Sequence, residues 1–330
     1  MRYIKAIIAA FCALTLMVTL FSGCSERENA GETGKRVAVI VKSVDSDFWH
    51  SVKEGVSSAA TEYNVSVTFE GPANEEDYMT QNSMIEKALE EKYDAVVLSA
   101  IDEERSAKYV EEAVRNGLRV VAIDSGVDTG LVDMFIGTDN VAAGKLAASA
   151  SAELFNPDKA HGGKMRIGLV TCNAETENIR SRVNGFKEAV SELPNAEIVS
   201  EVSVNNNRQS AVTGALELIR SCPEINVLVG FNEWTTLGVG DAVKSMSAGE
   251  SILGVGFDTN FISVGMIETG EMDVLIVQNP FAIGYLGVEY AAMLASGETV
   301  TETEVYTDVT VVTRENLFDE EVQKMVFRFE

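Results

Sequence analysis

The sequence predicts an α/β protein in which doubly wound parallel sheets form two lobes. Apolar runs rich in β-branched residues recur along the chain, and they are too continuous for strands with one exposed face. Segments with a helical spacing of apolar residues separate these runs, which is the alternation expected of βαβ units with right-handed crossovers. The alternation starts at Arg36 and again at Met165, so we expect one sheet from each half of the chain.

The individual elements follow from this alternation. Buried parallel strands are predicted at residues 36–41, 95–98, 119–123, 165–170, 227–231 and 251–256. The clearest helices are predicted at residues 48–63, 78–92, 141–154, 179–191 and 210–220. His161-Gly162-Gly163 is predicted to be a loop within the second half and not a flexible linker between domains.

Residues 1–23 have the features of an export signal. Arg2 and Lys5 precede an apolar run over residues 7–20. This run is shorter than the roughly 20 residues that a membrane-spanning helix needs. A charged start, an apolar middle and a small-residue end are typical of a segment removed during export, so we expect the mature protein outside the cytoplasm.

Cys24 follows this segment directly. Leu20-Phe21-Ser22-Gly23-Cys24 resembles the bacterial lipobox, in which the cysteine thiol is diacylated and becomes the mature N-terminus. The alternative is an ordinary signal peptide with an incidental cysteine. Residues 24–35 are polar, as expected of a flexible tether between a lipid anchor and a folded domain. We therefore predict a protein anchored by lipid to the cell membrane, on its periplasmic side or outer face.

The composition limits the class of partner. The chain contains 51 Asp and Glu against 26 Lys and Arg, a formal net charge of −25. A surface with this charge repels nucleic acid and anionic lipid head groups, so we expect no nucleic-acid partner. About 300 residues remain after the signal is removed, which is long for one core and suits two lobes.

The cysteines and histidines beyond the tether predict neither a disulfide nor a metal site. Cys172 follows a predicted strand whereas Cys222 precedes one. The two therefore belong to opposite edges of a parallel sheet, roughly 20 Å apart at about 3.3 Å per residue. A disulfide requires Cα atoms within about 7 Å. His50 and His161 have no ligand-like spacing.

Polar and aromatic side chains follow nearly every predicted strand. In open parallel sheets ligands bind at the carboxyl ends of the strands, so we expect these side chains to surround one cleft. The segments concerned are 42–49, 124–126, 138–140, 173–180, 205–208, 231–233, 256–258 and 278–281. An Asp or Asn in such a loop is often only an N-cap or turn residue, and Phe48 and Trp49 also suit core packing. Capping does not require Lys42, Arg180 or Gln278, so the set as a whole predicts a ligand site.

These segments resemble the periplasmic sugar-binding proteins of the ribose/galactose type, which are type I solute-binding proteins of ABC importers. The resemblance covers essentially the whole mature chain, and it is carried by the joint order and spacing of several short motifs. These motifs are Val39-Ile40-Val41-Lys42, Asp47-Phe48-Trp49, Val52-Lys53-Glu54-Gly55, Asp124-Ser125-Gly126, Gly137-Thr138-Asp139-Asn140, Arg180-Ser181-Arg182-Val183-Asn184-Gly185-Phe186, Phe231-Asn232-Glu233, Val255-Gly256-Phe257-Asp258 and Val277-Gln278-Asn279-Pro280-Phe281.

The resemblance implies the type I periplasmic binding protein fold, with two lobes joined by a multi-strand hinge. It implies an N-terminal lobe of residues 36–138 and 279–303 and a C-terminal lobe of residues 139–278 and 304–330. The ligand contacts that it implies are Phe48, Trp49, Asp124, Asn140, Arg180, Asn232, Asp258 and Gln278. Lys42 and Ser46, in the segment after the first predicted strand, are predicted as further ligand contacts. The resemblance also implies an ABC transporter permease as partner and hinge closure around the ligand as the mechanism.

The chemistry of this predicted site suits a sugar or polyol. Asp124 and Asp258 can accept hydrogen bonds from vicinal hydroxyls, and Lys42 and Arg180 can donate charge-assisted bonds, while amides do both. The two aspartates balance the two cations, which predicts a ligand that is neutral or carries at most one negative charge. The sequence predicts no cofactor and no catalytic residue.

Two positions depart from the ribose-type pattern. Proteins of that type often carry arginine where this chain has Ser125, and usually a polar uncharged residue where it has Lys42. Both departures look more like the autoinducer-2 receptor branch and other sugar receptors, which argues against ribose itself. Lys42 is expected to point into the cleft, with a solvated lysine at the rim as the alternative.

Sequence features argue against an enzyme and against a transcription regulator, whereas a sensory receptor stays open. A glycosidase would need Asp124 and Asp258 as acid and base, but nearby cations and amides lower a carboxyl pKa and spoil a general acid. The chain has no P-loop, nucleophile elbow or complete G-x-G-x-x-G. The export signal argues against a transcription regulator. A sensory receptor that presents a sugar or furanosyl signal to a membrane kinase or chemoreceptor stays open, because it would use the same closing lobes.

Overall fold

The computed structural model describes residues 34–159, 161–172, 176–246 and 252–326 of the 330. The predicted signal, the predicted lipid site at Cys24 and most of the predicted tether lie outside these ranges. Within the described residues, no helix is both long enough and apolar enough to cross a membrane.

The first lobe is built on a parallel sheet of six strands in the order β11-β5-β4-β3-β1-β2. Its strands are β1 (Arg36–Ile40), β2 (Ser66–Glu70), β3 (Ala95–Leu98), β4 (Arg119–Ile123), β5 (Met134–Gly137) and β11 (Glu304–Tyr306). Its helices are α2 (Asp47–Glu62), α3 (Tyr78–Glu90), α4 (Glu103–Arg115) and α10 (Pro280–Ala295).

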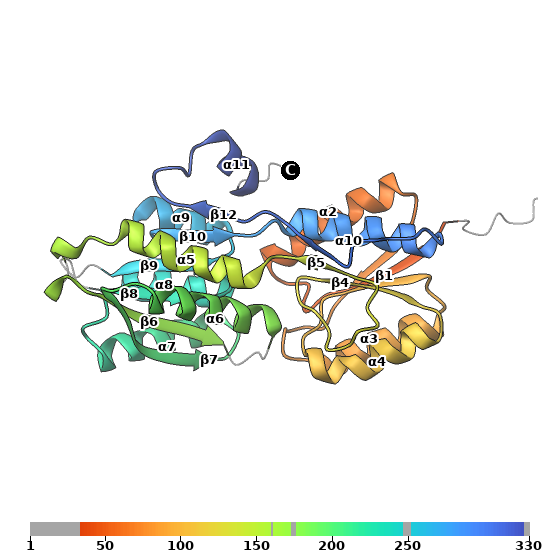
Figure 1. The fold of residues 1–330 in the computed structure, drawn as a ribbon, viewed down its shortest axis with the longest axis horizontal. Coiled ribbons are helices and arrows are strands. Elements are labelled where there is room, and N and C mark those ends of the chain that lie inside the picture. Colours follow the sequence, from red (N-terminus) through yellow and green to blue (C-terminus); the bar gives the residue numbers. More distant parts are fainter. Residues whose placement is uncertain (1–33, 160, 173–175, 247–251, 327–330) are drawn as a thin grey trace, which may run out of the picture. The chain divides into compact units, whose positions relative to one another are not determined.

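Helices cover both faces of this sheet (Figure 1). In β1, Val37 and Val39 pack in the cluster that contains the buried faces of α2 and α10. The alternate residues Ala38 and Ile40 pack in the cluster that contains those of α3 and α4. Both faces of the strand therefore need apolar side chains, which explains why its sequence is a continuous apolar run.

The second lobe repeats this arrangement with the strand order β12-β10-β9-β8-β6-β7. Its strands are β6 (Met165–Cys172), β7 (Ala196–Val204), β8 (Val227–Gly230), β9 (Leu253–Phe257), β10 (Val274–Val277) and β12 (Thr310–Val312), of which β12 alone runs antiparallel to its neighbour. Its helices are α5 (Asn140–Leu154), α6 (Glu177–Ser191), α7 (Arg208–Ser221), α8 (Glu233–Lys244), α9 (Phe261–Thr269) and α11 (Glu320–Val326). Two short 3₁₀ turns, η1 (Pro157–Lys159) and η2 (His161–Gly163), precede β6, so the predicted loop at 161–163 is one of these turns.

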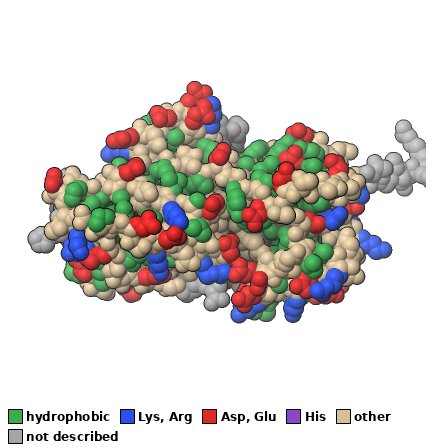
Figure 2. Space-filling view, in the orientation of Figure 1, with side chains coloured by type: hydrophobic (Ala, Val, Ile, Leu, Met, Phe, Trp, Pro, Cys, Tyr) green, Lys and Arg blue, Asp and Glu red, His purple; other side chains and the backbone are tan. Residues whose placement is uncertain are grey.

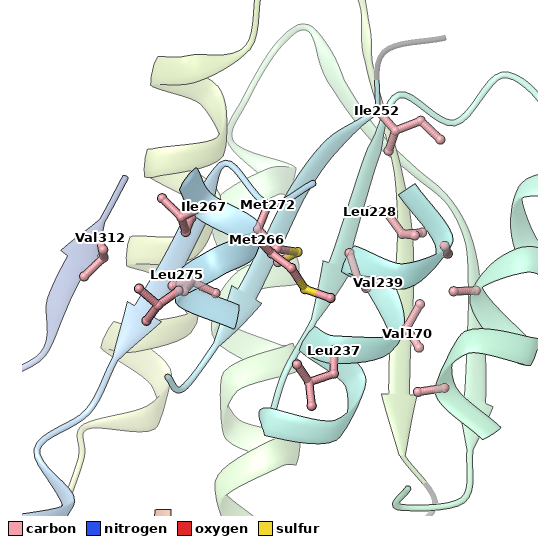
Figure 3. Close-up of a cluster of buried hydrophobic side chains, with 14 of the residues drawn as sticks. Val170, Leu228, Leu237, Val239, Ile252, Met266, Ile267, Met272, Leu275 and Val312 are labelled. Carbon is pink, nitrogen blue, oxygen red and sulfur yellow. The ribbon is translucent and has the colours of Figure 1, made fainter. Parts of the chain in front are cut away.

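One face of the second sheet packs against α7, α8 and α9 (Figure 3). Leu228 and Leu275 extend from the strands, and Leu237 and Met266 meet them from α8 and α9. A separate cluster on the opposite face contains the buried residues of α5 and α6. The structure thus confirms the predicted α/β class with two doubly wound sheets.

The described chain passes between the two sheets three times, after β5, after β10 and between β11 and β12. The first two crossings are joined by a hydrogen bond of 2.8 Å from Thr138 Oγ1 to Gln278 Oε1. Strand β11 pairs with β5 in the first sheet, whereas the sequence analysis assigned residues 304–330 to the second lobe. The reason is that this strand of three residues has exposed or half-exposed side chains and joins the sheet through its backbone, which leaves no apolar signature.

Acidic side chains occur over both lobes on the face drawn in Figure 2. No disulfide joins Cys172, at the end of β6, to Cys222, which follows α7. Cys172 lies at the carboxyl end of β6 and Cys222 lies before the start of β8, which agrees with the predicted separation of the two thiols at opposite edges of the sheet.

Two pairs of helices approach closely at glycines. A Cβ atom on Gly284 of α10 would lie 2.2 Å from the carbonyl oxygen of Val52 in α2, and one on Gly55 would lie 2.0 Å from that of Phe281. The second lobe has the same contact, since a Cβ on Gly144 of α5 would lie 2.0 Å from the carbonyl oxygen of a residue in α6. These positions accept only glycine because the obstacle is backbone, which cannot rotate away.

We predict that Gly284→Ala destabilises the protein by overpacking the contact between α2 and α10. The free energy of unfolding should fall by about 1–3 kcal/mol in urea titration. Gly265→Ala in α9 is the matched control, because nothing lies within 4 Å of the added Cβ. The control should leave stability unchanged or raise it by about 0.5–1 kcal/mol. Equal effects of the two changes would contradict the close approach.

Candidate functional site

A small cavity lies where the carboxyl ends of strands from both sheets meet, as expected for doubly wound sheets. Its volume is about 40 Å³, measured as the space open to the centre of a water molecule. One ordered water needs roughly 10–15 Å³ by this measure, so the cavity suits only a small ligand. The lining residues are Lys42, Ser46, Phe48, Trp49, Glu75, Asp124, Thr176, Asn178, Ile179, Arg182, Asn232, Glu233, Trp234, Asp258 and Gln278.

Asp124 and Asp258 occupy equivalent positions in the two lobes. Each directly follows its strand, β4 or β9, and its backbone N–H donates to a neighbouring strand, to Ile136 O at 2.9 Å and Ile276 O at 3.0 Å respectively. Their φ angles are +59° and +67°, a left-handed conformation that non-glycine residues adopt rarely and aspartate tolerates better than most. Backbone strain of this kind is common at ligand sites.

Lys42 neutralises Asp124 at the first of these positions. Its ammonium lies 2.8 Å from Asp124 Oδ2 and donates to Ser125 Oγ, and both side chains of the ion pair are almost fully buried. The sequence alternative of a solvated lysine at the rim is therefore wrong. Burial raises the pKa of Asp124, but the charges of Lys42 and Arg182 outweigh burial and hold the pKa below its usual value.

Arg182 lies beside Asp258 at the second of these positions. It was not among the ligand contacts predicted from the sequence. Its side chain is 1% exposed. Nε donates to Asn140 Oδ1 at 2.9 Å and Nη1 to Phe231 O at 3.0 Å, while Nη1 lies 3.8 Å from Asp258 Oδ2. The guanidinium also lies over the Phe257 ring. Nη2 is buried without a hydrogen-bond partner among the described residues.

The structure contradicts the expectation that Arg180 faces the cavity. Arg180 is exposed and forms an ion pair with Glu103 of the first lobe. The physical reason is helical periodicity: residues two apart on α6 point about 200° apart at 3.6 residues per turn. Arg182, by contrast, shares the buried face with Ile179 and Phe186, at spacings of three and four. The sequence signal that could have identified Arg182 is its place among the apolar residues on one face of the helix.

Asn140 is also absent from the cavity lining. It is buried at the start of α5, where its side-chain oxygen accepts the bond from Arg182 Nε. Its contact is therefore with the arginine that lines the cavity. The other eight predicted contacts, Lys42, Ser46, Phe48, Trp49, Asp124, Asn232, Asp258 and Gln278, do line it.

Ser46 and Asn232 line the cavity as well as capping helices. Ser46 Oγ accepts from Trp49 N at the start of α2, and Asn232 Oδ1 accepts from Thr235 N at the start of α8. The cap interpretation and the site interpretation are thus compatible. Thr176 differs, since it precedes α6 but makes no side-chain cap bond, and its buried hydroxyl has no partner among the described residues.

Aromatic rings form part of the cavity wall. Phe48 is half-buried and meets Trp49 edge to face, with ring centroids 4.9 Å apart. Trp49 is 2% exposed and donates from Nε1 to Glu75 Oε1 at 2.7 Å. Trp234, which the sequence analysis did not predict, lines the cavity from the second lobe.

Two glutamates add negative charge that the sequence analysis did not anticipate. Glu75 lies in the loop after β2, and Glu233 is the first residue of α8. Burial raises the pKa of Glu75, although the charge of Lys42 opposes this effect. Burial likewise raises the pKa of Glu233 to about 7, with Asp258 adding to the shift and a bond from Asn260 opposing it. The predicted balance of two carboxylates against two cations therefore becomes four carboxylates against two cations.

Asp258 has a raised pKa, whereas the sequence analysis expected nearby cations and amides to lower it. Burial raises the pKa of Asp258, and the charge of Arg182 and a 2.6 Å bond from Gln278 Nε2 only partly offset this effect. Gln278 therefore joins Asp258 to Thr138 of the first crossing, since it donates to the former and accepts from the latter.

Hydrogen bonds cross between the lobes around the cavity. Asn178 Nδ2 of α6 donates to Asp124 Oδ1 at 3.2 Å, and Asn206 Nδ2 donates to Glu75 Oε2 at 2.8 Å. Among the described residues, no group of three His, Cys, Asp or Glu side chains is arranged to hold a metal ion. The chemistry on offer is therefore hydrogen bonding and charge pairing to a small polar molecule with an apolar face.

Comparison with known proteins extends over both lobes. Residues 37–299 match the family model described as periplasmic binding protein domain. The ribose import binding protein of Bacillus subtilis is 26% identical over 304 residues, which are 88% of this chain and 94% of that protein. A carbohydrate transporter solute-binding protein from Agrobacterium radiobacter, solved in complex with D-arabinose, has a TM-score of 0.84 at 26% identity, covering 89% of this chain and 99% of its own. A sugar transporter from Clostridium phytofermentans has a TM-score of 0.75 at 31% identity, covering 84% and 99% respectively.

We predict that Lys42→Met destabilises the protein because it leaves Asp124 buried without its counter-ion. Breaking a buried ion pair in this way costs about 3–5 kcal/mol in free energy of unfolding. Adding Asp124→Asn in the same chain should recover part of the loss, and urea titration at neutral pH measures both. The effect should fade as the pH falls below about 4, because the depressed pKa of Asp124 contributes stability only above the unfolded-state value.

Lys187→Met is the matched control for this pair. Lys187 forms a surface ion pair with Glu201 at 2.6 Å, and surface pairs contribute at most about 1 kcal/mol. A loss at Lys42 no larger than the loss at Lys187 would contradict the importance of the buried pair.

Proposed function

The chain belongs to the periplasmic binding protein domain family, and from this premise we propose that it is a solute-binding protein that captures a sugar or sugar-like small molecule. The family implies an extracytoplasmic location. Members named in the comparisons are transport proteins, and two of them are described as binding ribose or D-arabinose. We propose delivery to the permease of an ABC importer on the same grounds.

The observation that carries the proposal is the unpartnered guanidinium nitrogen of Arg182, a residue that lines the cavity. A buried donor without an acceptor is costly, so the site is built for an oxygen atom from outside the chain. The unpartnered Thr176 hydroxyl and the carboxylates Asp124 and Asp258 line the same cavity. Together they supply donors and acceptors for neighbouring hydroxyls, which a sugar carries in quantity.

The aromatic rings support the same ligand class. A sugar ring has an apolar C–H face as well as its hydroxyls, and Phe48, Trp49 and Trp234 offer apolar surface beside the polar groups. The other lining residues, apart from Ile179, are polar or charged, as suits a ligand with many hydroxyls. The described contacts fit capture and do not require a chemical reaction.

We propose hinge closure as the mechanism of capture. The lining comes from both lobes, so a ligand in the cavity would add contacts between them and favour the closed arrangement. The division at residues 138/139 and 278/279 fits the two crossings joined by Thr138 and Gln278, with β11 counted in the first lobe. Within the site, we propose Lys42, Ser46, Phe48, Trp49, Asp124, Arg182, Asn232, Asp258 and Gln278 as ligand contacts.

We also propose that the protein is tethered to a membrane through a lipid on Cys24. The support is the sequence Leu20-Phe21-Ser22-Gly23-Cys24 after an apolar export segment. A tether of this kind would keep the binding protein close to its permease.

The binding proposal predicts that Arg182→Lys weakens sugar binding strongly. Lysine keeps the charge but cannot supply the forked donors of arginine, so the loss should be roughly tenfold to a hundredfold. A thermal-shift screen of the full-length chain against pentoses, hexoses and polyols identifies the ligand, because a ligand of the native state raises the unfolding midpoint. Calorimetry then measures the two affinities.

Arg180→Lys is the matched control, since Arg180 lies on the same helix outside the cavity. Its affinity should stay within about threefold of the wild type, because lysine can still pair with Glu103. If no sugar or polyol shifts the midpoint, the proposed function is wrong. Similar losses in the two variants would remove Arg182 from the contacts.

The anchoring proposal predicts that Cys24→Ala abolishes lipid attachment. Wild-type protein should partition into the detergent phase of a detergent extraction of whole cells, because a diacyl chain provides stable membrane anchoring. The variant should stay uncleaved or appear in the aqueous phase. Ser25→Ala, next in the chain, serves as control and should behave as wild type. Wild-type protein that is found only in the aqueous phase would refute the lipid anchor.

A further inference from the structure

We propose that the ligand is a sugar carrying a protonated amine, recognised by Glu233 together with Glu75. This inference rests on the proposed sugar-binding function and narrows its ligand class. It arises from the charge balance of the cavity, whose lining contains four carboxylates and two cations among the residues that the structure describes.

Both cations of the lining are committed to the aspartates. Lys42 lies 2.8 Å from Asp124 and Arg182 lies 3.8 Å from Asp258. The partners of the two glutamates are neutral: Trp49 and Asn206 donate to Glu75, and Asn260 donates to Glu233 at 2.8 Å. Within the part of the chain that the structure describes, no lysine or arginine nitrogen forms an ion pair with either glutamate.

The surroundings of Glu233 are negative from more than one side. Burial raises its pKa to about 7, and the charges of Asp258 of its own lobe and of Asp47 and Glu75 of the first lobe contribute to the rise. The hydrogen bond from Asn260 lowers the pKa of Glu233, yet the pKa stays raised. A cation placed beside Glu233 would satisfy the charge that the protein itself leaves uncompensated.

A second feature of the cavity requires oxygen as well as nitrogen in the ligand. Arg182 Nη2 and Thr176 Oγ1 are buried and unpartnered among the described residues, and both residues line the cavity. Arginine can only donate, so it needs an acceptor such as a hydroxyl or ring oxygen. A simple amine lacks these oxygens and a neutral sugar lacks the positive charge, whereas an amino sugar has both.

The test compares each amino sugar with its neutral parent on the full-length chain. The probes are the 2-amino-2-deoxy, 3-amino-3-deoxy and 6-amino-6-deoxy forms of D-glucose, D-galactose and D-allose, each against the parent sugar in calorimetry. In at least one pair the amine should bind about tenfold more tightly or better, as expected when a neutral hydrogen bond becomes a charge-assisted one. Glu233→Gln and Glu75→Gln should each reduce that preference, while Glu224→Gln on the surface should not.

The pH dependence of ligand affinity in the wild type is an independent test. A carboxyl with a pKa of about 7 is mostly protonated at about pH 6 and mostly ionised at about pH 8. A 6-amino group resembles the lysine ammonium and stays protonated at both values. Its affinity should therefore rise with pH over this interval, whereas a neutral sugar that accepts a bond from protonated Glu233 would bind less well as the pH rises.

The outcomes separate this inference from the proposed function. If the neutral parent binds more tightly in every pair, the amine is refuted and the sugar-binding function stands. If an amine is preferred but neither glutamine variant changes the preference, the assignment to Glu233 and Glu75 is wrong. If neither member of any pair binds, the amino-sugar inference fails, and the proposed function is then decided by the screen against pentoses, hexoses and polyols.

Discussion

Burial of charge between two lobes is the constraint on which the candidate site depends. Asp124 and Asp258 end equivalent strands in the same left-handed conformation, so each lobe delivers one carboxylate to the cavity. A buried carboxylate needs a counter-charge or donors close by. Lys42 supplies the counter-charge from the segment that follows β1 of its own lobe, across the intervening strand β3, whereas Arg182 faces Asp258 from α6 at a longer distance. The different pKa directions of the two aspartates follow from this difference.

The packing of the helices fixes the positions of these charged residues. Helix α10 begins after a crossing from the second sheet yet packs on the first, and α5 begins after the opposite crossing and packs on the second. Each helix meets its partner, α2 or α6, at glycines whose missing side chains allow backbone contact. Because Arg182 supplies the carbonyl that Gly144 approaches, the same close contact that packs α5 against α6 also fixes the backbone of a cavity residue.

Central strands of the fold are easier to predict from the sequence than edge strands. The runs that form β1, β3 and β4 are buried on both faces, and a continuous apolar run is the local mark of that burial. Strands β2 and β7 lie at the edges of their sheets and are mostly half-exposed, so their residues alternate without a clear apolar run. Glu75 follows β2, and because no apolar run marks this strand, the sequence does not show that Glu75 lies at the end of one.

The sequence by itself determined the fold class, the two starts of the sheet and most of the residues that line the cavity, because these depend on local periodicity and on the rule that parallel strands end at one edge. Only the tertiary structure decided between Arg180 and Arg182, since the choice depends on which face of α6 turns toward β9. It also revealed the raised pKa of Glu233, because the ionisation of a carboxyl group depends on burial and on neighbours from both lobes. Those neighbours are distant in sequence, so their combined field has no local signature.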